Sequence, residues 1–153
     1  MRQKTMLVLS GILAIYLMFP GIINAEKKYP DIVVEMVDAA KKDINKIDMA
    51  TFRQVVDKKD YDLLIDAREP DEYAEGHVPG AINIPRGVIE FKIWKEVGFP
   101  EKTDIAKKIY INCRTGGRAS LSTKALKDLG FTNVTAVIMK MEEWIEAGHP
   151  IEK

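Results

Sequence analysis

The chain has 153 residues, of which 46% are apolar and 30% charged, a balance typical of one globular domain and not of a disordered chain. The sequence has 23 lysines plus arginines and 23 aspartates plus glutamates, so it lacks the excess of positive charge that is typical of nucleic-acid-binding proteins. A single cysteine rules out an internal disulfide, and two histidines far apart in sequence suggest no metal cluster.

The first 25 residues have the pattern of a secretory signal peptide rather than of a folded segment. Arg2 and Lys4 give a positive start, residues 6–19 are a nearly unbroken apolar run, and Pro20 breaks it. Ala25 supplies the small residue that a signal peptidase requires. The alternative is an uncleaved anchor, although the run is short for the ~20 residues that span a bilayer. We expect a periplasmic or secreted protein, or else a membrane-anchored one that faces the periplasm.

Residues 26–45 are expected to form a helical extension ahead of the domain. Within it, residues 30–42 have helical periodicity, with Pro30 and Asp31 at the start and charged side chains on one face. The apolar face consists of Ile32, Val33, Met36, Val37 and Ala40. The simplest interpretation is a helix packed against the domain, and a partner surface or membrane contact is the alternative.

Residues 46–153 are expected to form one α/β domain. A helix is predicted over residues 50–58, with Asp48 as its cap. Four short apolar runs then alternate with helical or irregular segments, at residues 63–65, 81–84, 109–111 and 134–138. Continuous apolar runs of this length are typical of strands that are buried on both faces. They predict a small central parallel β-sheet flanked by helices on both faces.

Two more helices are predicted in the C-terminal half. The first begins near Ala119 and stops at Gly130. Its apolar stripe consists of Leu121, Ala125, Leu126 and Leu129. The second is short, covers residues 141–147, and ends before Gly148.

The candidate chemistry lies in residues 113–118, between a predicted strand and a predicted helix. Gly116 and Gly117 are expected to let this loop turn through positive φ. Unpaired N–H groups at the helix start, the helix dipole and two guanidinium groups all favour an anion at Cys113. A buried, inert thiol is the alternative, but these surroundings indicate a reactive thiolate.

Two segments resemble signatures of the rhodanese (sulfurtransferase) family. Residues 66–85, DAREPDEYAEGHVPGAINIP, are similar to the family's D-x-R…E-[FY]-x-x-G-H-I-P-G-A-x-N-[IV]-P signature. Residues 113–118, CRTGGR, are similar to its active-site C-R-x-G-x-R loop, and residues 130–134 give a weaker third match. One departure is Met139-Lys140, where the family usually has two glycines. Two side chains at that position bear on the width of the pocket and on the acceptor that it admits.

The resemblance implies that Cys113 attacks the outer sulfur of a donor such as thiosulfate or polysulfide, without a metal or a cofactor. The resulting persulfide would then pass its sulfur to a thiol or to cyanide. Loop N–H groups would cradle the persulfide, and Arg114 and Arg118 would hold the oxyanion of the donor. Thr115 would hydrogen-bond the terminal sulfur, and Arg86 would line the mouth of the site. For each of these side chains a surface or turn-capping role is the alternative.

Four other residues, Asp66, Arg68, Glu72 and His77, look like an acid–base set within one segment. We expect them to be structural instead, because ion pairs and a histidine bonded to backbone would fix the loop that follows. Trp144 is expected in the core.

Other functions share parts of this pattern. A cysteine phosphatase or arsenate reductase needs a Cys-x5-Arg loop, but the residue six positions after Cys113 is Ala119, and Arg118 comes one position too early. A persulfide carrier that serves a partner oxidoreductase would use the same loop chemistry. A redox-sensing thiol would leave the long 66–85 signature unexplained.

The mature chain is predicted to begin at Glu26, because Ala25 ends the signal pattern and charged residues return at once. N-terminal sequencing of the protein from an exporting host checks this. Recovery of the intact Met1 chain in the membrane fraction would favour the anchor.

Overall fold

A computed structural model describes residues 29–153, so the predicted signal at residues 1–25 lies outside the described part. The elements run in the order α1 (Asp31–Lys42), β1 (Asn45–Asp48), α2 (Met49–Lys58), β2 (Leu63–Asp66), α3 (Pro70–Glu75), β3 (Ala81–Asn83), η1 (Arg86–Val88), α4 (Ile89–Glu96), β4 (Ile109–Asn112), α5 (Gly117–Asp128), β5 (Val134–Ile138) and α6 (Met141–Glu146). None of the helices in residues 29–153 has the length and apolar character needed to cross a bilayer.

The sheet has five strands, all parallel, in the order β1-β5-β4-β2-β3. All four predicted strands are present. The prediction missed β1, which pairs with β5 from Asn45↔Thr135 to Asp48↔Ile138. This strand lies at the edge of the sheet, and its three polar residues, Asn45, Lys46 and Asp48, are all exposed. It therefore lacks the apolar run that is typical of a strand buried on both faces.

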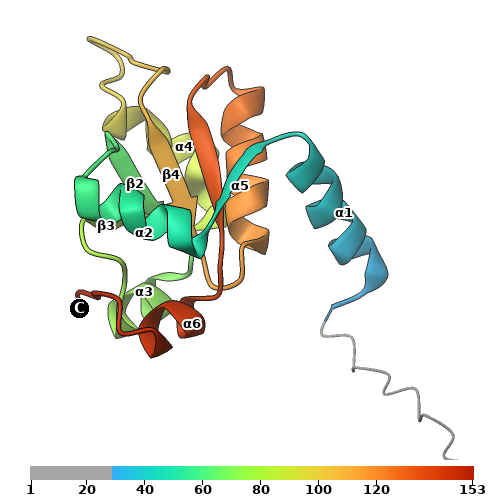
Figure 1. Cartoon of the computed structure of the whole chain (residues 1–153). Coiled ribbons are helices and arrows are strands. Elements are labelled where there is room, and N and C mark those ends of the chain that lie inside the picture. Colours follow the sequence, from blue (N-terminus) through green and yellow to red (C-terminus); the bar gives the residue numbers. More distant parts are fainter. Residues whose placement is uncertain (1–28) are drawn as a thin grey trace, which may run out of the picture.

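Helices cover both faces of the sheet, as predicted (Figure 1). Successive side chains on each strand point to opposite faces. Ile109 and Ile111 of β4 pack with residues of α4 and α5, whereas Tyr110 packs with residues of α2 and α6. At the end of the sheet where the strands finish, α3 and α6 lie close to the start of α5 (Figure 1).

Helix α1 covers the expected residues, but only part of its predicted apolar face is buried. It packs beside α5, with Ala40 buried and Val33 and Val37 half-buried. Ile32 and Met36 are instead 72% and 51% exposed. The apolar arc of this helix is therefore wider than the stripe that it places against the domain.

Other boundaries differ in detail from the prediction. Helix α5 begins at Gly117 rather than near Ala119, and Leu129 is exposed beyond its end rather than part of a buried stripe. The prediction missed α3 and α4. The sequence did contain a pattern that could have predicted α4: Ile89 and Ile93 are one helical turn apart, and both side chains are fully buried.

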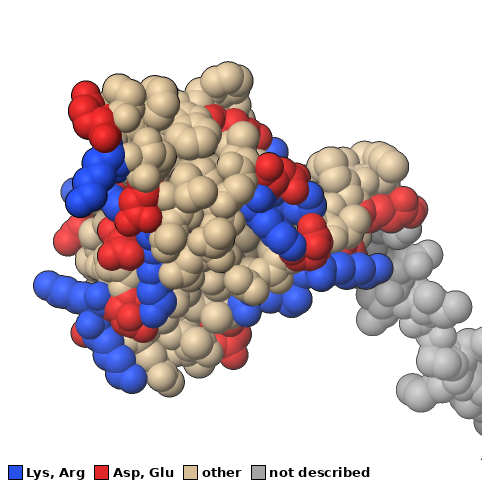
Figure 2. Space-filling view, turned by 90° about the horizontal axis from the view of Figure 1, so that it is seen from above, with Lys and Arg blue, Asp and Glu red and all other residues tan. Residues whose placement is uncertain are grey.

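Charged side chains are intermixed on the surface rather than separated by sign. On the face displayed in Figure 2, basic and acidic groups lie next to one another around apolar and neutral residues. This agrees with the equal numbers of basic and acidic residues in the sequence.

Candidate active site

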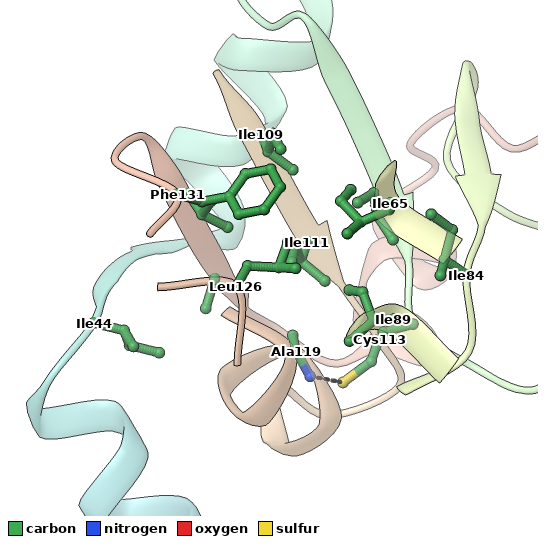
Figure 3. Close-up of a cluster of buried hydrophobic side chains, with 14 of the residues drawn as sticks. Ile44, Ile65, Ile84, Ile89, Ile109, Ile111, Cys113, Ala119, Leu126 and Phe131 are labelled. Atoms are coloured by element: carbon green, nitrogen blue, oxygen red, sulfur yellow. Dashed lines mark hydrogen bonds between the residues drawn. The ribbon is translucent and has the colours of Figure 1, made fainter. Parts of the chain in front are cut away.

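Cys113 lies directly after the central strand β4 and directly before the loop that enters α5. Its Sγ accepts hydrogen bonds from the backbone N–H groups of Gly116 at 3.2 Å and Ala119 at 3.3 Å. Figure 3 shows the sulfur at the border of the apolar cluster, directed at the Ala119 nitrogen. The side chain is only 1% exposed. Gly116, just before α5, and Ala119, in its first turn, thus each direct one N–H donor at the sulfur atom, where the donors favour negative charge.

Gly116 makes this loop possible, because its φ of +85° is strained for any residue with a side chain. An added Cβ would also come within 3.3 Å of the Cα atom of Ile138. Gly117 is different. It is the first residue of α5 and is not among the glycines with positive φ, so the expectation that both glycines turn through positive φ is wrong for Gly117.

Arg118 is held by Glu72, which lies on α3. Two hydrogen bonds of 2.5 and 2.8 Å join the guanidinium to the two carboxylate oxygens. Hydrogen bonding to Arg118 lowers the pKa of Glu72 to about 2, and the same contact raises the pKa of Arg118. The sequence predicts that Glu72 pairs within its own segment. Its carboxylate does accept from the Glu69 N–H at 3.2 Å, but its main partner is in the Cys113 loop.

Arg114 is exposed at the outer side of the loop and pairs with Glu142 at 2.6 Å, a contact that raises the pKa of the guanidinium. Its backbone carbonyl accepts a hydrogen bond from the Met141 N–H at 2.9 Å. The loop is therefore fastened to the start of α6 as well as to α3. Thr115 is exposed at the next position.

The remaining polar residues of the long signature hold its turn together, as expected. Arg68 donates to Asp66 at 2.7 Å and to the Gly76 carbonyl at 2.7 Å, and all of these charged groups are buried. His77 lies 3.2 Å from the Tyr73 carbonyl through Nδ1, and its ring stacks on Tyr73. The buried charges of Arg68 and Asp66 compensate each other, and their hydrogen bonds fix the segment that leads from β2 to β3.

Three other residues named from the sequence have side-chain partners outside the loop. Arg86 pairs with Glu90 at 2.9 Å and lines a different surface hollow. Met139 is buried in the apolar cluster around the fully buried Trp144, and the exposed Lys140 pairs with Glu143 at 2.5 Å. The first side chain in place of the family's glycine pair is thus used for core packing.

A cavity of about 390 Å³ lies between α1 and the Cys113 loop. One wall includes Val33, Val37 and Lys41 of α1, and the other includes Arg114, Arg118 and Leu121. Within residues 29–153, no group of three or more His, Cys, Asp or Glu side chains is placed to hold a metal ion.

Sequence reasoning did not predict three of these features: the pairing of Glu72 with Arg118, the pairing of Glu142 with Arg114, and the α1 wall. The two carboxylates are far from the arginines in sequence, so no local pattern pointed to them. The sequence did contain a signal for the α1 wall. The apolar face of this helix is wider than the surface that it packs against α5, so part of it remains for another contact.

Comparison with known proteins gives a consistent result. A family model described as "Rhodanese-like domain" matches residues 48–147. The chain is 33% identical over 101 residues to the "Putative sulfur carrier protein YrkF" of Bacillus subtilis; the match covers 66% of this chain but only 51% of that protein, so the chain spans about half its length. It is 29% identical over 124 residues to the thiosulfate:glutathione sulfurtransferase of Saccharomyces cerevisiae, covering 72% and 87% of the two chains.

Two solved structures have a similar fold. The polysulfide-sulfur transferase homodimer of Wolinella succinogenes is 27% identical, with a TM-score of 0.64, and the match covers 82% of this chain and 90% of that one. Protein RPA3614 of Rhodopseudomonas palustris, described as a "possible tyrosine phosphatase", is 29% identical, with a TM-score of 0.67 and coverage of 78% and 93%.

Replacing Glu72 by glutamine is expected to lower the free energy of unfolding by about 1–2 kcal/mol at neutral pH, because a charged hydrogen bond to Arg118 is lost. The pKa of Glu72 is lowered from 4.5 to about 2 in the folded protein. The contribution of the ionised Glu72 side chain to the free energy of unfolding is therefore complete above pH 4.5 and is lost as the pH falls towards 2. In urea unfolding at about pH 3, the difference in free energy of unfolding between the wild type and Glu72→Gln should therefore be half of the difference at neutral pH or less.

The matched control is Glu75→Gln, an exposed residue of the same helix, which should change stability by less than about 0.5 kcal/mol. An equal loss for Glu72→Gln at both pH values would contradict this account of the ion pair.

Proposed function

This chain belongs to the rhodanese-like domain family, and we propose that it is a sulfurtransferase in which Cys113 carries the transferred sulfur. Likeness to a thiosulfate:glutathione sulfurtransferase and to a polysulfide-sulfur transferase supports a sulfur-transfer role. The observation that carries the proposal is the pair of backbone N–H groups, from Gly116 and Ala119, that point at Sγ. Such donors stabilise a thiolate before the reaction and an anionic persulfide after it.

The first half of the reaction needs no general base. The Cys113 thiolate attacks the outer sulfur of thiosulfate, a new S–S bond forms, and the old S–S bond breaks. Sulfite leaves with the electron pair of the broken bond. The cysteine persulfide that remains is an anion in the same position, so the loop N–H groups serve both states.

The two loop arginines have different roles in this proposal. The side chains of Arg114 and Glu142 are 52% and 47% exposed, and such a pair contributes about 1 kcal/mol or less, so a donor oxyanion displaces the carboxylate at little cost. The side chains of Arg118 and Glu72 are 29% and 25% exposed and are joined by two hydrogen bonds. We therefore assign donor binding to Arg114 and positioning of the loop to Arg118.

The alternative is a persulfide carrier that delivers sulfur to a partner oxidoreductase. Likeness to the "Putative sulfur carrier protein YrkF" of Bacillus subtilis supports it. Loading in a single turnover with polysulfide, combined with negligible steady-state turnover of thiosulfate, would identify the carrier. We place either activity in the periplasm or outside the cell, on the basis of the signal pattern in residues 1–25.

A phosphatase is less well supported, despite the likeness to RPA3614. The position where that chemistry needs its arginine is Ala119, whose N–H group is used on the sulfur. The arginine one position earlier, Arg118, is already engaged by Glu72. A tetrahedral phosphate would therefore lack its bidentate partner.

Replacing Cys113 by serine is expected to lower thiosulfate:cyanide sulfurtransferase activity by about three orders of magnitude or more, because a hydroxyl is neither ionised at neutral pH nor able to hold a sulfane sulfur. Thermal unfolding of the same sample establishes that the variant is folded. Substantial activity in the folded Cys113→Ser protein would refute the proposed role.

A further inference from the structure

Helix α4 and the turn that follows it carry two strongly exposed aromatic side chains. Phe91 is 82% exposed, more than any other large apolar side chain in residues 29–153, and Phe99, just beyond the end of the helix, is 60% exposed. The helix packs on the core through Ile89 and Ile93, which lie on its other side. Neither phenylalanine is therefore needed to hold α4 on the domain, and both leave a large apolar area in contact with water.

The two phenylalanines are connected through Trp94. This tryptophan lies one helical turn from Phe91, and the centroid of its ring is 6.1 Å from that of Phe99. The Phe99 N–H donates to the Trp94 carbonyl at 3.0 Å, so the turn is fastened to the helix. Trp94 itself is half-buried, and its ring packs on the core residue Phe131. One ring anchored in the core thus joins two rings that face solvent.

Three exposed lysines accompany these rings without an acidic partner. Lys92 and Lys95 lie with Phe91 on the outer side of α4. Lys102 closes the turn that carries Phe99, because its N–H donates to the Gly98 carbonyl at 2.9 Å. Within residues 29–153, none of the three ammonium groups forms an ion pair or a hydrogen bond. Their positive charge is therefore available to an external partner.

The carboxylates of α4 and of the turn do not neutralise these lysines. Glu90 is held by Arg86 at 2.9 Å. Glu96 is half-buried and lies on a different side of the helix from Phe91. Glu101 is the single exposed carboxylate within residues 89–102. This part of the molecule therefore differs from the intermixed remainder of the surface, because it combines apolar rings with an excess of positive charge.

Exposed aromatic rings flanked by unpaired lysines are suited to a lipid surface that carries negative charge. The rings enter the interface between the headgroups, and the ammonium groups lie at the level of the lipid phosphates. The predicted signal or anchor in residues 1–25 brings this chain to a membrane during export and keeps it there if it is not cleaved. Two rings and three lysines bind weakly by themselves, and an uncleaved anchor would supply the second attachment that stable binding requires.

We propose that this surface lies on an anionic membrane and sets the orientation of the domain there. The α4 surface consists of Phe91, Phe99, Lys92, Lys95 and Lys102. It includes no residue of the Cys113 loop, so contact with lipid uses none of the groups that surround the sulfur atom. The inference goes beyond the proposed sulfur transfer and does not rest on it.

Tryptophan fluorescence makes contact between the α4 surface and lipid measurable. The sequence has two tryptophans, and Trp144 is fully buried on the opposite face of the sheet, so a response to lipid reports on Trp94. Vesicles that contain phosphatidylglycerol should shift the Trp94 emission to the blue, and brominated lipid chains should quench it. Vesicles of phosphatidylcholine alone should do neither. The signal comes from the surface itself, so it serves both for a chain that begins at Glu26 and for one that retains residues 1–25.

A first pair of variants tests the aromatic contact. In the chain that begins at Glu26, Phe91→Ser should lower partition into phosphatidylglycerol vesicles about ten-fold, because one ring no longer enters the interface. The matched control is Ile32→Ser, which removes an exposed apolar side chain from α1 and should leave partition unchanged.

A second pair tests the charge. Lys92→Gln combined with Lys95→Gln should lower partition about twenty-fold at low salt, because each lysine near an anionic surface contributes about five-fold. The difference from the wild type should shrink at high salt. The matched control is Lys58→Gln combined with Lys59→Gln, two exposed lysines at the end of α2, and this variant should behave like the wild type.

Absence of a Trp94 response to anionic vesicles in the wild type would overturn the inference, even if Cys113 is an active sulfur carrier. Equal loss of partition in Ile32→Ser and Phe91→Ser would also overturn it, as would binding of the α4 surface to an acidic protein but to no vesicle. Thiosulfate:cyanide activity in solution should be the same in all four variants. Failure of the membrane contact is therefore distinguishable from failure of the proposed function.

Discussion

The structure is organised around one constraint: the sulfur of Cys113 must lie where the N–H group of Gly116 and that of Ala119, in the first turn of α5, converge. Two N–H groups reach it, and this requires the left-handed turn at Gly116, where a side chain would be strained and would press on Ile138. The parallel sheet brings the other parts to the same place, because the carboxyl ends of its strands lie along one edge. The loop after β4, the turn after β2 and the segment after β5 therefore meet there.

Fixing the loop and binding a substrate make opposite demands on its charges. Arg118 bound to Glu72 joins α5 to α3, and the carbonyl of Arg114 bound to Met141 joins the loop to α6. These contacts give the loop a defined shape, but they also neutralise part of the positive charge that an anionic donor would use. The molecule combines the two demands by placing one ion pair half-buried and the other in solvent. In the proposed mechanism the first preserves geometry, and the second exchanges its carboxylate for the donor.

Much of this arrangement could be predicted from the sequence, and the failures have physical causes. Strands that are buried on both faces have continuous apolar runs, and these runs predicted β2, β4 and β5. The edge strand β1 is mostly polar and has no such run. The Cys113 loop was predicted because its glycine, its cysteine and the following helix are adjacent in the chain. The partners of its arginines were not, since Glu72 and Glu142 reach the loop only through the tertiary fold.

The central claim is that Cys113 carries a sulfane sulfur, and intact-protein mass spectrometry tests it most directly. After incubation with thiosulfate or polysulfide and removal of the donor, the account predicts a mass increase of one sulfur atom, located by peptide mapping at Cys113. A thiol or cyanide should then remove the added mass. A protein that gains no sulfur from either donor, or gains it at another residue, would contradict the account.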